Sequence, residues 1–225
     1  MQKPAVQGFL FDLHGVIADS WQYHLASWRQ IARELEVPWT PQLAEVLPGM
    51  SRRDSLKTIL SSDGRQSEFT APQFQAIATH ENELYQQMIT KMTPANRLPG
   101  VTSFLDELVA AGYPMALASA STNAPAEIDR LGLTGFFSKI VAAVQLQHSK
   151  PAPDVYLAAA KLVGLPPENC VAFEDTVTGM QSAKAAGCYT VGVNQRKLPG
   201  ADAMLADTTH LSLATVLRAL GQPVG

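Results

Sequence analysis

Short apolar runs that alternate with helical segments are the feature of this sequence that most restricts its fold. The first run, VQGFLF, leads directly to Asp12, and like the second and fourth runs it lacks polar alternation, as in a strand covered on both faces. We expect strands at residues 6–11, 115–120, 139–144, 170–174 and 189–193. Strands that alternate with helices in this way predict an α/β fold with a mainly parallel sheet.

The helical segments between these runs carry start and stop signals. Thr102 is the expected N-cap of a helix that stops at Gly112, and Asn123 is the expected N-cap of a segment with Pro125 in its first turn. Two further helices are expected to end at Gly164 and Gly187, because glycine is the residue that most often follows a helix.

Residues 20–96 break the alternation, since they contain helical patterns and no convincing strand. Ser20 and Ser51 are N-cap candidates, and Asp54 completes a capping-box pattern with Ser51. A further helix is expected over residues 72–92. The first helix has an apolar stripe at helical spacing, formed by Trp21, Leu25, Trp28, Ala32 and Leu35.

These patterns predict a two-domain chain. The core domain is expected to comprise residues 1–19 and 97–225, and residues 20–96 are expected to form an α-helical cap domain inserted after the first strand. The cap would act as a lid over the carboxyl ends of the strands, where α/β proteins place their sites. We expect it to move about hinges near residues 16–20 and 93–99.

Charge and composition exclude several classes of protein. A net charge of −3 argues against a nucleic-acid partner, which usually needs a basic face. No apolar run is long enough to span a membrane, and Asp12 interrupts the apolar stretch near the N-terminus, so neither a membrane segment nor a secretion signal is expected. Two cysteines are too few for a disulfide framework. We expect a cytoplasmic monomer that acts on a small molecule.

Four groups of polar residues follow the expected strands. Asp12 follows the first strand, Ser119, Ala120 and Ser121 follow or end the second, and Lys150 stands before a proline that restricts its backbone. The acidic pair Glu174 and Asp175 ends the fourth. Three carboxylates suit Mg²⁺, which prefers oxygen ligands and keeps waters. A lysine, a serine and backbone N–H groups suit a phosphate.

Each of these features has an ordinary structural explanation when taken alone. An aspartate at a strand end is usually a turn residue, SAST alone suggests a loop, and an acidic pair before a helix favours the helix dipole. Together, and in this order after expected strands, they favour a phosphate-handling site in which Asp12 attacks phosphorus and forms an aspartyl phosphate.

The chain resembles members of the haloacid dehalogenase superfamily in the motifs FDLHGVIADS, ASAST, SKPAPD and FEDTVTG. The resemblance implies a Rossmann-like parallel-sheet core with Asp12 as the nucleophile. It implies that Ser119, Ala120 and Lys150 bind the phosphate. It also implies a Mg²⁺ site formed by Asp12, Glu174, Asp175 and the backbone carbonyl of His14.

The expected cap resembles that of the β-phosphoglucomutase family within this superfamily, in HLASW at 24–28, PGMSRRDSL at 48–56 and ASASTNAP at 118–125. That family interconverts β-D-glucose 1-phosphate and glucose 6-phosphate through a β-glucose 1,6-bisphosphate intermediate, which also serves as activator. The resemblance implies that Arg52, at the start of a helix where an anion can dock, holds the phosphate distal to Asp12. The residues implied for the sugar site or the lid are Ser20, His24, Trp28, Gly49, Ser51, Ser55, Ser121 and Asn123. For His24 and Trp28, four residues apart on a helix, packing is the alternative.

Two positions depart from the family pattern. Glu81 stands where the family usually has a lysine, which weakens the positive charge expected at the distal phosphate. His14 stands where the family has the second aspartate of the D-x-D motif, the general acid and base. Histidine is well suited to proton transfer near neutral pH, but its ring differs from a carboxylate in reach. We expect impaired or altered proton transfer with metal binding retained.

Two other functions remain open. The same scaffold serves Mg²⁺-dependent phosphatases of small sugar or polyol phosphates, in which water accepts the phosphoryl group. A catalytically silent sugar-phosphate-binding protein is the third reading, which His14 alone favours and which the intact Asp12, Lys150, Glu174 and Asp175 oppose.

Overall fold

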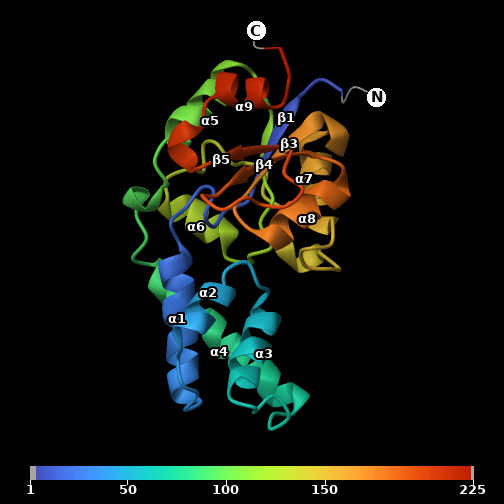
Figure 1. Ribbon diagram of the computed structural model, residues 1–225. Coiled ribbons are helices and arrows are strands. Elements are labelled where there is room, and N and C mark those ends of the chain that lie inside the picture. Colours follow the sequence, from blue (N-terminus) through green and yellow to red (C-terminus); the bar gives the residue numbers. More distant parts are fainter. Residues whose placement is uncertain (1–3, 224–225) are drawn as a thin grey trace. The chain divides into compact units, whose positions relative to one another are not determined.

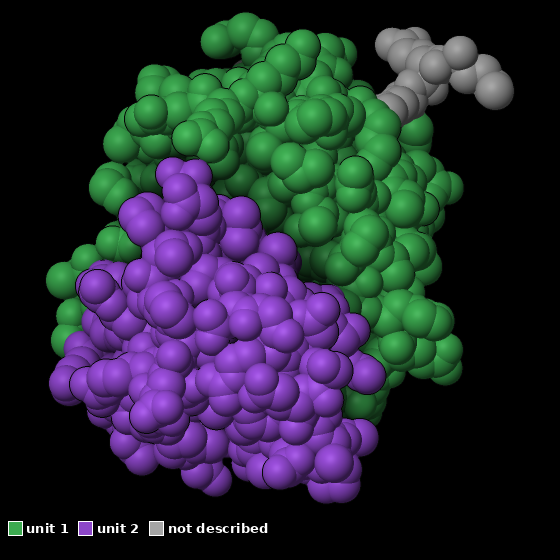
Figure 2. All heavy atoms as spheres, turned by 60° about the horizontal axis from the view of Figure 1, so that its bottom comes forward, with its two compact units in different colours: residues 1–19, 93–225 green, residues 20–92 purple. Residues whose placement is uncertain are grey.

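The computed structural model describes residues 4–223, and the chain divides into two compact units. One unit comprises residues 1–19 and 93–225, and the other comprises residues 20–92 (Figure 2). We refer to them as the α/β unit and the helical unit. Residues 93–96, assigned to the cap from sequence, fall in the α/β unit. The reason is that Asp19 N donates to Asn96 O at 2.9 Å and Leu98 N donates to Ile17 O at 3.0 Å.

The α/β unit contains a five-stranded sheet in the order β2-β1-β3-β4-β5, with every neighbouring pair parallel. This topology confirms the predicted fold class. Strand β1 lies between β2 and β3, and its Phe11 pairs with Leu117 on one side and with Phe173 on the other. The strands are β1 (Gly8–Phe11), β2 (Met115–Leu117), β3 (Cys170–Glu174), β4 (Tyr189–Val193) and β5 (Ala203–Leu205).

Helices cover both faces of this sheet (Figure 1). One face carries stacked phenylalanines: the rings of Phe11 and Phe173 lie 4.9 Å apart, and Phe104 of α5 meets both rings edge-on. The opposite face carries Leu10, which joins a buried cluster with residues of α7 and α8. Coverage on both faces explains why the central strands are apolar throughout. The helices of this unit are α5 (Val101–Ala110), α6 (Ala124–Arg130), α7 (Asp154–Val163), α8 (Val177–Ala186) and α9 (Leu213–Ala219).

Helix ends in the α/β unit follow the sequence signals, with one correction. Asn123 is the N-cap of α6, and Gly164 and Gly187 end α7 and α8 in left-handed conformations. The expected cap Thr102 is wrong, because α5 begins two residues earlier than predicted, at Val101, with Gly100 as its N-cap. Gly100 has φ +81°, and a Cβ there would lie 2.4 Å from the carbonyl oxygen of Thr208, so only glycine fits.

Two edge strands differ from the prediction. Residues 139–144 do not form a strand: Ile140 makes only an isolated bridge with Leu117, and a 3₁₀ turn, η2 (Ala143–Gln145), follows. This apolar run makes backbone hydrogen bonds with β2 only at Leu117 and then leaves the sheet. Strand β5 was not predicted, because its apolar run is only three residues long; Leu205 is buried and the other two residues are partly buried.

The helical unit comprises α1 (Trp21–Glu34), α2 (Pro41–Val46), α3 (Arg52–Ser62) and α4 (Ala71–Ile89). Its own apolar core includes Trp28, Leu56, Ile59 and Leu84. Of the predicted stripe on α1, Trp28 and Ala32 are buried, whereas Trp21, Leu25 and Leu35 are partly exposed. Helix α4 ends at Ile89, three residues short of the expected 72–92 segment.

The start of α3 agrees with the sequence. Ser51 is the N-cap of α3, and its Oγ accepts from Asp54 N at 3.2 Å. Among residues 4–223, no helix combines the length and apolar character that crossing a membrane would require.

Candidate active site

Three carboxylates meet where the central strands end. Asp12 follows β1, and its N–H donates to Phe173 O at 3.1 Å, which holds it beside the end of β3. Glu174 is the last residue of β3 and Asp175 follows it. One ligand oxygen from each of these three side chains lies within 4.8 Å of the other two. The parallel sheet therefore brings Asp12 beside the adjacent pair Glu174 and Asp175, which lie far from it in the sequence.

Lys150 is the cation of this cluster. Its Nζ donates to Asp12 Oδ1 at 2.8 Å and to Glu174 Oε1 at 2.5 Å. Burial alone would lower the pKa of Lys150, but the charges of Asp12 and Glu174 outweigh burial and raise it above its usual value. The ammonium group therefore stays charged at neutral pH, and its positive charge can offset the negative charge of an incoming phosphate.

Glu174 is fully buried and accepts several hydrogen bonds. Besides Lys150, Tyr156 OH donates to Oε1 at 2.6 Å and Thr176 Oγ1 donates to Oε2 at 3.4 Å. Burial raises the pKa of Glu174, to about 7, while the Lys150 ammonium opposes this rise. Burial and the nearby carboxylates also raise the pKa of Tyr156, so its hydroxyl remains a donor. Sequence reasoning missed Tyr156, whose only signal is its place two residues into α7.

The acidic cluster fits a divalent cation. Counted as ionised, Asp12, Glu174 and Asp175 carry three negative charges and Lys150 one positive charge, which leaves two to be neutralised. Mg²⁺ prefers oxygen ligands of this kind. Gly15 leaves room beside them: it has φ +74°, and a Cβ there would lie 1.9 Å from Asp175 Oδ2. The backbone of Asp175 is held by Asn194, whose Nδ2 donates to its carbonyl oxygen at 2.9 Å.

The loop after β2 carries the predicted phosphate-binding residues. Ala118 N donates to Phe11 O at 2.7 Å, which keeps this loop beside the end of β1. Ser119 is buried, and its Oγ accepts from Ser121 N at 3.2 Å, whereas Ala120 is exposed. The structure thus places Ser119, Asp12 and Lys150 at the ends of neighbouring elements, which suits a phosphate group between them.

His14 lies in the loop after β1, and its side chain is 11% exposed. Its Nδ1 lies 3.5 Å from Oε2 of Glu127, a side chain with no exposed surface. The other oxygen of Glu127, Oε1, accepts from Ser121 Oγ at 3.4 Å. Ser121 Oγ in turn accepts from the backbone N–H of the buried Asn123 at 3.2 Å. Sequence reasoning missed Glu127, although it lies four residues after Asn123 on a short helix, where the two side chains share a face.

Arg52, the residue expected to bind a distal phosphate, is paired within the helical unit. Its Nε donates to Glu81 Oε2 at 2.6 Å, and its Nη2 donates to Asn82 Oδ1 at 2.8 Å. Glu81 is 1% exposed and also accepts from Ser27 Oγ at 2.6 Å. Glu81 therefore offsets the charge of Arg52 and holds its side chain in place.

The other residues expected to bind sugar have mixed surroundings in their own unit. Trp28 is 4% exposed and belongs to the apolar core, which agrees with the packing alternative. His24 stacks on Tyr85 with ring centroids 4.0 Å apart. Gly49 has φ +82°, as loops before a helix often need. Ser20 and Ser55 are buried, and Ser51 caps α3.

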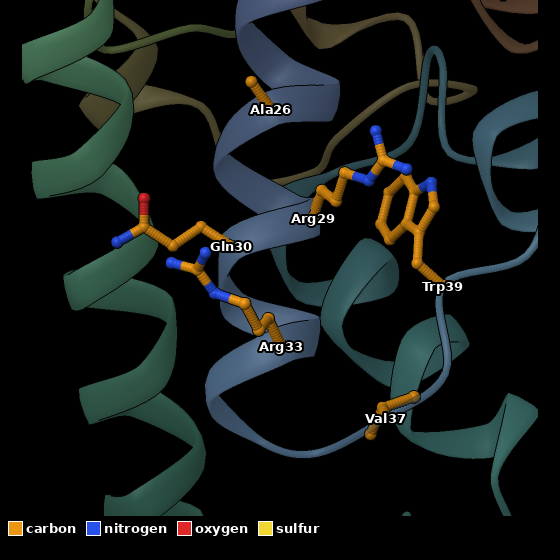
Figure 3. Close-up of a pocket in the computed structure, with 6 residues that line it drawn as sticks. All are labelled: Ala26, Arg29, Gln30, Arg33, Val37 and Trp39. Carbon is orange, nitrogen blue, oxygen red and sulfur yellow. The ribbon is translucent and has the colours of Figure 1, made fainter.

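A pocket of about 500 Å³ lies in the helical unit (Figure 3). Figure 3 shows Arg29 extending toward the Trp39 indole from α1. The lining residues are Ala26, Arg29, Gln30, Arg33, Val37 and Trp39. None of the site residues predicted from the sequence is among them.

Comparisons with known proteins agree with this arrangement. The family model of the haloacid dehalogenase-like hydrolases matches residues 9–193. The β-phosphoglucomutase of Bacillus subtilis (strain 168) is 36% identical over 209 residues, which cover 92% of each chain. The fructose-1-phosphate phosphatase of Escherichia coli (strain K12) is 31% identical over 191 residues, which cover 83% of this chain and 95% of that protein.

A solved structure extends the likeness to the whole fold. The crystal structure of β-phosphoglucomutase from Clostridium difficile superimposes with a TM-score of 0.91 at 30% identity, covering 96% of this chain and 97% of the other.

Proposed function

Because this chain belongs to the haloacid dehalogenase-like hydrolase family, we propose that it is a sugar-phosphate phosphotransferase that interconverts β-D-glucose 1-phosphate and glucose 6-phosphate. The observation that carries the transfer chemistry is the cluster of Asp12, Lys150 and two further carboxylates at one edge of the sheet. The choice of hexose phosphate is supported by the 36% identity with a β-phosphoglucomutase over 92% of the chain.

The first half of the reaction transfers a phosphoryl group to Asp12. A carboxylate oxygen of Asp12 attacks phosphorus, the bond from phosphorus to the sugar oxygen breaks, and an aspartyl phosphate forms. Lys150, already 2.8 Å from Asp12, offsets the negative charges that must come together. Ser119 and the backbone N–H groups of its loop orient the phosphate.

The second half returns the group to a different hydroxyl. The aspartyl phosphate transfers its phosphoryl group to the 6-hydroxyl of β-glucose 1-phosphate, which forms β-glucose 1,6-bisphosphate and frees Asp12. After the bisphosphate turns around, Asp12 takes the phosphoryl group from the 1-position, and glucose 6-phosphate leaves while the aspartyl phosphate is formed again. We propose that His14 donates a proton to the departing sugar oxygen and later accepts one from the attacking hydroxyl. Such a positioned group is typically worth 10²- to 10⁴-fold in rate.

Asp12, Glu174, Asp175 and the backbone carbonyl of His14 are the proposed ligands of Mg²⁺, which members of this family generally use. When bound, the ion supplies charge stabilisation to the transferring phosphoryl group. The residues of the chain do the rest: Asp12 provides the nucleophile, and Lys150 and Tyr156 hold Glu174 in place.

A phosphatase acting on a sugar phosphate is the second candidate, and one observation favours it. The buried Glu81 offsets the charge of Arg52, which weakens the case for a second phosphate-binding group in the helical unit. The relative from Escherichia coli that is 31% identical over 83% of this chain is a fructose-1-phosphate phosphatase. A silent binding protein is disfavoured, because binding alone needs no carboxylate poised beside Lys150.

Product analysis tests the proposal. The protein is incubated with Mg²⁺, β-glucose 1-phosphate and a trace of the 1,6-bisphosphate, and glucose 6-phosphate and free phosphate are measured together. We expect glucose 6-phosphate, and we expect no product from Asp12→Asn. Free phosphate without glucose 6-phosphate would replace the mutase with the phosphatase, and neither product from any sugar phosphate would leave only binding.

A parallel assay of His14→Asp tests the acid–base assignment. If His14 transfers protons, the unmodified protein turns over at a rate comparable to this variant. If only the variant turns over, the substrate is right and His14 is the block. A change of less than tenfold in either direction supports His14 as a working group.

A further inference from the structure

We infer that Glu127 is a positioning residue for His14: it holds Nδ1, so that Nε2 is the nitrogen that exchanges a proton with the sugar oxygen. The inference rests on the proposed function, because it assigns His14 a role in proton transfer. It adds a residue that has no place in the four motifs and that lies on a separate element, α6.

The burial of Glu127 requires a partner for its carboxylate. The side chain has no exposed surface, and an ionised carboxylate without hydrogen bonds in such surroundings is costly. Oε1 accepts from Ser121 Oγ, but Oε2 makes no hydrogen bond with any described residue. The group that faces Oε2 is His14 Nδ1 at 3.5 Å, an ion-pair distance that is longer than a usual hydrogen bond.

The remaining gap is small. Catalytic hydrogen bonds are often long before substrate binds and shorten in the complex. A modest rotation of the imidazole would bring an Nδ1–H onto Oε2 and satisfy the buried oxygen. The arrangement therefore selects one ring orientation and one tautomer, in the way that a carboxylate behind a histidine does in other proton-transfer sites.

A purely structural role explains less of the geometry. Glu127 lies in the first turn of α6, where an acidic residue stabilises the helix dipole. That benefit needs no burial, and an exposed carboxylate in the same turn would supply it without the cost of leaving water. Complete burial facing His14 points to a function for the pair.

The Ser121 contact ties the pair to the phosphate loop. Ser121 Oγ donates to Glu127, and Ser121 N donates to Ser119 Oγ at 3.2 Å. One carboxylate thus fixes the imidazole relative to the loop expected to hold the phosphate. The orientation of His14 relative to the transferring group then depends on Glu127.

The first test reads the tautomer directly and needs no activity. Long-range ¹H–¹⁵N spectra of ¹⁵N-histidine-labelled protein are recorded at a pH where imidazole is neutral, and His14→Gln assigns the signal. We expect the Nδ1–H tautomer to dominate, and we expect Glu127→Gln and the apolar Glu127→Leu to shift the balance toward that of histidine in water. An Nε2–H tautomer in the unmodified protein, or no shift in either variant, would overturn the inference.

The second test separates positioning from folding. Glu127→Gln should lower kcat roughly 10- to 100-fold and change KM less than twofold. Asp129→Asn, an exposed acidic residue on the same helix, is the matched control and should leave both unchanged. In the His14→Asp background, Glu127→Gln should leave kcat unchanged or raise it, because two adjacent carboxylates repel. An equal loss in both backgrounds would show a structural role and overturn the inference.

These readouts keep the two proposals apart. The expected tautomer with no turnover of glucose phosphates contradicts the proposed function alone. Turnover with an unaffected tautomer contradicts the role of Glu127 alone.

Discussion

Gly15 shows how one residue without a side chain shapes the site. It has φ +74°, and a Cβ would lie 1.9 Å from Asp175 Oδ2, so any larger residue must displace a proposed metal ligand. Gly112 provides a matched control, because it has φ +75° and nothing within 4 Å of its Cβ position. The pair separates backbone strain from collision with the carboxylate.

We predict that Gly15→Ala destabilises the protein and weakens Mg²⁺ binding at least tenfold. Gly112→Ala should cost only the left-handed strain, about 1–2 kcal/mol, with Mg²⁺ affinity unchanged. Thermal unfolding and Mg²⁺ titration calorimetry check both variants. Equal Mg²⁺ affinity for the two variants would mean that Gly15 is not required beside Asp175.

Cys170 is a buried thiol whose reactivity the structure predicts. Burial, together with the charge of Glu168, raises its pKa to about 12. The thiolate is the reactive form, so a raised pKa lowers reactivity at every pH below it. Compared with the usual thiol value of 9.0, a pKa of about 12 means that a roughly thousandfold smaller fraction of this thiol is ionised near neutral pH. We predict that iodoacetamide alkylates Cys170 at least 100 times more slowly in the folded protein than in urea, as measured by peptide mass spectrometry. Similar rates in the two conditions would contradict the buried environment.

Single residues differ in how far sequence alone could place them. Asp12 and Glu174 were predicted because each stands where a strand ends, and parallel strands bring their carboxyl ends to one edge. Glu127 and Tyr156 lie on helices and reach the site only through helix packing against the sheet. Their spacing in the sequence predicts which face of a helix they occupy, but not which residues pack against that face. Their contacts could therefore be identified only from the structure.

The N-cap residue of α8 also contacts the acidic cluster. Thr176 is the N-cap, with Oγ1 accepting from Gly179 N at 3.1 Å, and the same hydroxyl donates to Glu174 Oε2. Ser212 caps α9 in the same way, accepting from Thr215 N at 3.1 Å, but no carboxylate of the acidic cluster lies against it among the described contacts.

We predict that Thr176→Ala and Ser212→Ala each cost about 1 kcal/mol of unfolding free energy, because each removes one N-cap. Only Thr176→Ala should also lower kcat, since it removes a hydrogen bond to Glu174. Urea denaturation and the glucose 6-phosphate assay measure the two effects. A matching loss of kcat in Ser212→Ala would mean that the effect arises from stability rather than from the site.

At this scale, prediction from the sequence succeeded for β1, β2, β3 and β4, and it failed for β5 and for residues 139–144. The three inner strands were found because full burial makes them continuous apolar runs. Residues 139–144 show the same composition yet make only one bridge, and the apolar run of β5 is only three residues long. A segment forms an edge strand only where the N–H and C=O groups of a neighbouring strand are available for pairing. That availability depends on tertiary structure.

The whole molecule consists of two units with separate apolar cores. Leu10 belongs to a cluster of the α/β unit, and Leu56 belongs to a cluster of the helical unit. The switch from alternating strands and helices to helices alone predicts a division at residue 96, and the compact helical unit ends at residue 92. The difference arises at Asn96, whose carbonyl oxygen accepts from Asp19 N in the segment that leaves the sheet, a pairing with no sequence signal.

Because the two units have separate cores, we predict that Mg²⁺ binding stabilises only the unit that carries its ligands. All three carboxylates belong to the α/β unit, so an ion that binds only the folded site stabilises that unit by RT ln(1 + [Mg²⁺]/Kd), about 2.7 kcal/mol at 100 times Kd. Hydrogen exchange with and without EDTA should show increased protection around Asp12 and Glu174 when Mg²⁺ is present. The buried core around Leu56 serves as the internal reference and should exchange at the same rate in both conditions. Asp175→Asn should remove most of the Mg²⁺-dependent protection, whereas Asp129→Asn should not. Protection that rises equally in both units would place the ion elsewhere, because only binding at these carboxylates confines the effect to the ends of β1 and β3. No rise in protection in either unit would mean that these carboxylates do not bind Mg²⁺.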